Sequence, residues 1–134
     1  MYRLEQFSVF LRSPKLPMLI IEPGMILAAD STDQLMAALS QAVEHKGMGT
    51  MVALVDGDGR GFAFDPKQKV LLPSFPRHAW TKGEIVDAYN ATCASEEEHY
   101  RFSLASRRME RVVAEIAALV LTRRDDQLEG DSGS

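Results

Sequence analysis

Short apolar segments separated by turn residues fill the first half of the chain and predict β-strands. Their β-branched and aromatic residues end at proline, glycine or aspartate, which is typical of strands. Strand-like segments lie at 2–11, 18–22, 50–55 and 61–65. Residues 69–73 are expected to add a further short strand. Residues 25–29 are expected to continue the second strand beyond the Pro23-Gly24 turn.

Three segments have apolar residues at helical spacing behind a capping residue, and they predict helices. In each, a serine or threonine precedes a glutamine or glutamate by three residues, which is the spacing of a capping box. The expected helices begin after Ser31, Thr81 and Ser95. The third is the longest, and its apolar stripe consists of Phe102, Ala105, Met109, Val112, Val113, Ile116 and Val120.

The order β-β-α-β-β(-β)-α-α predicts an α+β fold. The simplest architecture is a small antiparallel sheet of four to six strands with helices packed on one face. No repeat or linker divides the chain, so residues 1–124 are expected to form a single globular domain. Residues 125–134 are acidic and almost without apolar side chains, and we expect a disordered tail there.

Composition narrows the class of protein. The 134 residues are 46% hydrophobic and 25% charged, with a formal net charge of −4, which opposes non-specific binding to nucleic acid. Cys93 is the single cysteine and fits a reducing compartment. The apolar stretch 16–29 is interrupted by Glu22, Pro23 and Gly24 and is too short to span a bilayer. These features predict a cytoplasmic protein with no membrane partner.

The stretch VDGDGRGFAF resembles the loops that bind calcium or phosphate. Counted from Asp56, a calcium loop needs an oxygen ligand at its fifth position and a bidentate acid at its twelfth. Arg60 and Lys67 occupy these positions, and no Lys-Ser or Lys-Thr pair follows the glycines as a phosphate loop requires. The pattern therefore predicts a hairpin turn, and we expect no metal and no cofactor.

The irregular stretch 74–82 is the strongest candidate for a binding site. Tryptophan and arginine dominate interface hot spots, and functional residues gather on loops. The alternative is that the aromatic residues only anchor this loop to the core while its basic residues face solvent. The predicted ligand or partner site consists of Phe75, Arg77, His78, Trp80 and Tyr89.

Three functions from different classes remain open. The first is a non-catalytic binding or interaction module for a small molecule or a protein. It is expected to be a homodimer, because Leu104, Leu119 and Leu121 widen the apolar face of the last helix. The second is a small enzyme whose acid-base residues meet only in the fold, with His78, His99, Asp87 and Glu84 as candidates.

The third function is nucleic-acid binding through the basic residues of the last helix. These are Arg101, Arg107, Arg108, Arg111, Arg123 and Arg124. Glutamates such as Glu110 and Glu115 lie at spacings that offset part of this charge, so we regard a solvated, ion-paired helix face as the better interpretation.

Overall fold

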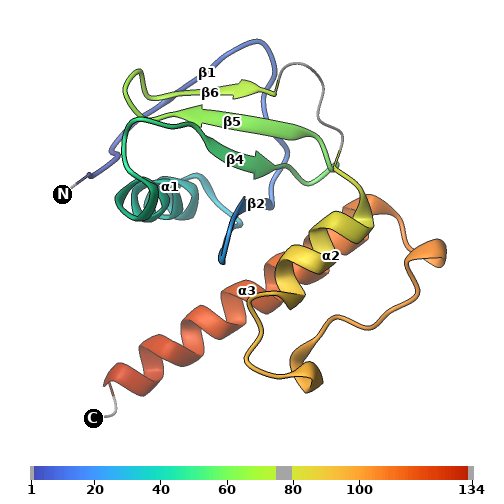
Figure 1. The fold of residues 1–134 in the computed structure, drawn as a ribbon. Helices are drawn as coiled ribbons and strands as arrows, with labels where there is room; N and C mark the ends of the chain where they lie inside the picture. Colours follow the sequence, from blue (N-terminus) through green and yellow to red (C-terminus); the bar gives the residue numbers. More distant parts are fainter. Residues whose placement is uncertain (1, 75–79, 133–134) are drawn as a thin grey trace.

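Six strands form one sheet with three helices packed against it (Figure 1). The computed structural model describes residues 2–74 and 80–132, with side chains of the last helix described as far as Arg123. The strands are β1 (Ser8–Val9), β2 (Met18–Glu22), β3 (Met25–Ala29), β4 (Val52–Val55), β5 (Gly61–Asp65) and β6 (Val70–Pro73). The helices are α1 (Thr32–Lys46), α2 (Lys82–Asn90) and α3 (Met109–Ser132).

The strand order across the sheet is β1-β6-β5-β4-β2-β3. Neighbouring strands are antiparallel except for β1, which runs parallel to β6 at one edge of the sheet. The predicted α+β class and mainly antiparallel sheet are confirmed. The segment 25–29 forms a strand of its own, because the Pro23-Gly24 turn reverses the chain and β3 pairs back onto β2.

The helices divide between the two faces of the sheet, so their expected placement on one face is wrong. Met18 and Ile20 of β2 pack with α1, whereas Leu19 and Ile21 of the same strand pack with α2 and α3. Side chains of a strand alternate between faces, so a strand that is apolar at successive positions needs cover on both sides. β2 is such a strand, and Figure 1 shows α1 set apart from the α2–α3 pair.

The first two predicted helices begin at their predicted caps. The Ser31 hydroxyl accepts a hydrogen bond from the Gln34 N–H. Thr81 and Glu84 form a complete capping box, in which each side chain accepts from the other residue's backbone N–H. These caps satisfy N–H groups that have no partner within their helix.

The third helix begins at Met109 and not behind Ser95, which corrects the sequence-based boundary. Ser95 makes no side-chain cap, and residues 95–108 contain only two short 3-10 turns, 96–98 and 104–106. Phe102 is exposed, and the expected apolar stripe is buried only from Val112 onward. The segment is held instead by Tyr100, which is buried and donates its hydroxyl to Glu115 of α3.

α3 continues to Ser132 and extends past the sheet toward the C-terminus (Figure 1). It therefore includes residues 125–132 of the tail 125–134. The disorder expected for that tail remains a prediction. Across the described ranges, no helix combines the length and the apolar character that crossing a membrane requires.

The predicted hairpin is confirmed, and the turn between β4 and β5 is organised by a buried carboxylate. Both Asp56 oxygens act as acceptors: Oδ1 for the N–H groups of Asp58 and Arg60, and Oδ2 for the Lys15 N–H and the Arg60 guanidinium. Arg60 Nη2 lies 3.0 Å from Oδ2. The oxygens that resembled cation ligands are thus bound by donors of the chain itself.

The glycines of this turn permit close packing rather than phosphate binding. A Cβ added at Gly57 would lie 3.0 Å from the carbonyl oxygens of Lys15 and Leu16. A Cβ at Gly59 would lie 2.3 Å from Cγ of Met109, at the start of α3. Gly59 also has φ +84°, a conformation that disfavours other residues. The turn therefore packs between the segment before β2 and the first residue of α3.

Gly59→Ala is expected to destabilise the fold more than Gly24→Ala. Both glycines have positive φ, but a Cβ at Gly24 would meet nothing within 4 Å. Gly24→Ala should cost about 1 kcal/mol from its conformation alone, and the clash with Met109 should add at least about 1 kcal/mol at position 59. Urea unfolding of both variants measures the difference. Equal losses would contradict the close contact with Met109.

Asp56→Ala is expected to lower the free energy of unfolding by about 3 kcal/mol or more, because it removes the acceptor of three backbone N–H groups and the closer of the two carboxylates that pair with Arg60. Asp58 is the matched control. Its carboxylate is partly exposed and pairs with Lys15 and Arg60 at 3.3 and 3.4 Å, so Asp58→Ala should cost less than about 1 kcal/mol. Similar losses in the two variants, measured by denaturant unfolding, would show that Asp56 does not organise the turn.

Candidate binding groove

The structure places two of the five predicted site residues. Phe75, Arg77 and His78 lie outside the described residues. Trp80 is half-buried against the core cluster beneath α2 and α3. Tyr89 belongs to the same cluster and is only 2% exposed, so its ring serves the core.

The surroundings of Tyr89 account for the raised pKa of its hydroxyl group. Burial is the largest cause of the raised pKa of Tyr89, and the neighbouring Cys93 raises it further. Arg123 acts in the opposite direction, since its guanidinium carbon lies 5.1 Å from the centre of the ring. Cys93 itself is half-buried, and its thiol lies 3.5 Å from the Tyr89 carbonyl oxygen. These contacts fix the end of α2 against α3.

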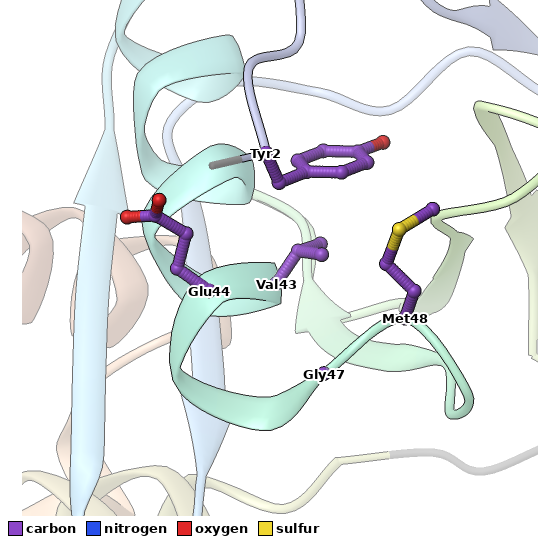
Figure 2. Close-up of a pocket in the computed structure, with 5 residues that line it drawn as sticks. All are labelled: Tyr2, Val43, Glu44, Gly47 and Met48. Carbon is purple, nitrogen blue, oxygen red and sulfur yellow. The ribbon is translucent and has the colours of Figure 1, made fainter.

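A surface groove lies where the N-terminal segment crosses the end of α1 (Figure 2). Its volume is about 540 Å³, and it is open to solvent. The lining residues are Tyr2, Val43, Glu44, Gly47 and Met48. Figure 2 shows the Tyr2 ring and the Met48 side chain on the same side of the helix as Val43, whereas the Glu44 carboxylate points away from them. The space between ring and thioether is therefore lined mainly by apolar atoms.

Both walls of the groove are held in place. The Tyr2 hydroxyl donates to the Pro66 carbonyl oxygen at 3.0 Å. Burial is the main cause of the raised pKa of Tyr2, and the charge of Asp65 adds to it. The hydroxyl therefore stays protonated, remains a donor at neutral pH and ties the ring to the β5–β6 turn.

The opposite wall depends on Lys46 at the end of α1. Its ammonium group donates to the Met51 carbonyl oxygen at 2.7 Å and to both carboxylate oxygens of Glu22 at 2.9 Å. Glu22 also accepts the Ala53 N–H at 2.8 Å. These bonds close the loop 47–51, which carries Met48, onto the sheet.

Two methionines on this loop are exposed to solvent, Met48 by 46% and Met51 by 42%. Methionine is flexible and polarisable, and it is over-used on surfaces that bind other proteins. Only Met48 of the two lines the groove. The arrangement can therefore receive an apolar group between Tyr2 and Met48, with Val43 beneath it.

The arginines proposed for nucleic-acid contact mostly have partners within the chain. Arg107 and Arg111 bind the same Glu115 oxygen at 2.7 and 2.8 Å. The Arg107 guanidinium also lies over the Phe102 ring at 4.2 Å. Arg123 donates to Thr92, through its carbonyl and its hydroxyl oxygen. These contacts favour the ion-paired helix face over a phosphate-binding surface.

Three of the four acid-base candidates lie in the part of the chain that is described. Glu84 and Asp87 lie exposed on α2, and the Glu84 carboxylate accepts the Thr81 N–H as part of the helix cap. His99 is half-buried in the segment after α2, and His78 falls in the range that is not described. Over the described residues, no cluster of three or more His, Cys, Asp or Glu side chains is placed to hold a metal ion.

Comparisons of the chain with protein-family models, with curated proteins and with solved structures give no match. Its function is therefore inferred from its own residues.

Glu115→Gln is expected to reduce the dependence of stability on acid pH. Burial raises the pKa of Glu115, but hydrogen bonds from Tyr100 and Arg111 and the charges of Arg107 and Arg111 outweigh it, so the pKa is lowered overall. A carboxyl group whose pKa is lower in the folded state stabilises the fold above its unfolded pKa. That contribution is lost as the pH falls through the folded value.

The free energies of unfolding of wild type and the Glu115→Gln variant should therefore differ at about pH 7 and converge toward about pH 3. Glu110→Gln is the control, because Glu110 is exposed on the same helix. If both substitutions change the pH dependence equally, the bonds to Tyr100, Arg107 and Arg111 do not cause it.

Proposed function

We propose that this protein is a non-catalytic interaction module that binds an apolar side chain of a protein partner in the groove between Tyr2 and Met48. The observation that carries the proposal is the pairing of a fixed aromatic ring with an exposed thioether over Val43, a combination that leaves apolar surface open to solvent. Apolar surface of this kind gains free energy when a partner covers it.

The chemistry of the groove favours a protein over a small molecule. Small-molecule sites are enclosed, and a few convergent polar groups fix the orientation of the ligand. Here the Tyr2 hydroxyl is already bound to Pro66, and the Glu44 carboxylate points away from the space. The groove offers contact area without polar discrimination, which suits an anchor residue whose position is set by the rest of a larger interface.

The two other candidate functions find less support in the contacts. Catalysis needs a nucleophile or base within hydrogen-bond reach of an orienting group, and the Glu84 carboxylate is instead part of a helix cap. Phosphate binding needs available cations, and Arg107, Arg111 and Arg123 are bound to Glu115 or Thr92.

Met48→Gln is expected to weaken partner binding, whereas Met51→Gln is expected to preserve it. The two methionines are nearly equally exposed and belong to the same loop, but only Met48 lines the groove. Peptides selected from a displayed random library on the immobilised protein are the probe, and their affinity for each variant is measured by calorimetry. Removing the thioether contact should cost about tenfold in affinity, or about 1.4 kcal/mol.

The selected peptides should share an apolar anchor residue. Thermal unfolding of both variants checks that neither change disturbs the fold. Equal affinity of the peptides for the two variants, or a selection that yields no binding peptide, would contradict the proposed site.

A further inference from the structure

Among the described residues β1 is the outermost strand at one edge of the sheet, and three consecutive exposed apolar residues, 9–11, lie at its end and directly after it. Val9 is 42% exposed, Phe10 54% and Leu11 74%. Edge strands of soluble proteins are usually protected by charges, proline or a covering segment, because their unpaired backbone groups can pair with another strand. The sequence from Gln6 to Leu11, QFSVFL, contains no charged residue, no proline and no glycine.

The backbone of this edge is arranged to accept another strand. The N–H groups of Ser8 and Phe10 donate to the Lys69 and Leu71 carbonyl oxygens of the neighbouring chain segment, both at 2.9 Å. Successive residues of a strand direct their backbone groups to alternate sides, so the N–H and C=O of Val9 point to the open side of the sheet. Val9 is therefore the residue about which an added strand would pair.

The composition of this segment also indicates which strand would pair with it. Uncharged segments with high β-propensity and without proline or glycine pair readily with copies of themselves. Glu5 precedes this segment and Arg12 follows it directly. In an antiparallel pairing about Val9 the start of one copy's segment meets the end of the other's, so these charges are opposite in sign where the two copies meet.

We propose that the β1 edges of two copies of this chain pair antiparallel about a two-fold axis, with Val9 of each copy facing Val9 of the other. The two Val9 residues exchange N–H to C=O hydrogen bonds, and the apolar side chains at 9–11 become covered. Because both copies use the same edge, the pairing closes at a dimer and does not propagate. This dimer does not rest on the proposed function of the groove.

The pairing differs from the dimer that the sequence of the last helix suggested. Leu104 and Leu121 are half-buried and pack onto the chain's own core beneath α2 and α3. Leu119 remains exposed, by 39%. Two of the three leucines on which that dimer rested are therefore covered within one chain, which makes Leu119 a suitable control position.

Leu11→Asn tests the interface with little risk to the fold. Leu11 has φ 68°, which asparagine tolerates better than leucine, and its side chain is mostly in solvent. Light scattering coupled to size exclusion should show a dimer of the wild type across the micromolar range. Leu11→Asn should raise the dimer dissociation constant at least about tenfold, and Leu119→Asn should leave it unchanged.

A cross-link tests the register independently. In a background of Cys93→Ser, Val9→Cys should give a disulfide-linked dimer with oxidised glutathione, because Cα atoms in such a pair lie about 5.5 Å apart, within disulfide range. Leu119→Cys in the same background should not. A monomeric wild type, loss of the dimer only in Leu119→Asn, an assembly larger than a dimer, or equal cross-linking at both positions would overturn the proposal.

Discussion

The buried Asp56 carboxylate is the interaction on which the rest of the fold depends. It binds the N–H groups of its own turn, the Arg60 guanidinium and the Lys15 N–H, and so joins the β4–β5 hairpin to the segment that enters β2. A buried charge costs free energy unless its partners are complete, and here each oxygen has more than one donor. Gly59 then lets Met109 approach the turn, which places the start of α3 against it.

The sequence alone predicted the structure correctly where a local signal and the tertiary packing agree. The hairpin, the Ser31 cap and the capping box of Thr81 and Glu84 all follow from residues a few positions apart. The Ser95 box failed, because Phe102 gained no burial and Tyr100 bonded to Glu115 fifteen residues away. The division of the helices between two faces was also missed, although the continuous apolar run of β2 was a signal for it.

The groove could not be predicted, because none of its residues is unusual by itself. Tyr2 reads as part of a strand, Val43 as a core position of α1, and Met48 as a loop residue. They meet because the chain entering the sheet crosses the end of α1, which depends on long-range hydrogen bonds from the Tyr2 hydroxyl to Pro66 and from the Lys46 ammonium group to Glu22. Residue type favoured the stretch 74–82 instead, and Tyr89 was added to that predicted site although the fold uses it as core.

The N-terminal segment connects the groove and the β1 edge. Leu4 is buried and donates its N–H to the Ser40 hydroxyl of α1, and Phe7 packs edge-on against Phe64 of β5. These two residues anchor the segment, whereas Tyr2 before them and Val9 after them face the groove and the open edge. The same anchors therefore position both proposed surfaces, and a change that loosens Leu4 or Phe7 acts on both at once. A surface substitution such as one at Met48 or Leu11 acts on one alone.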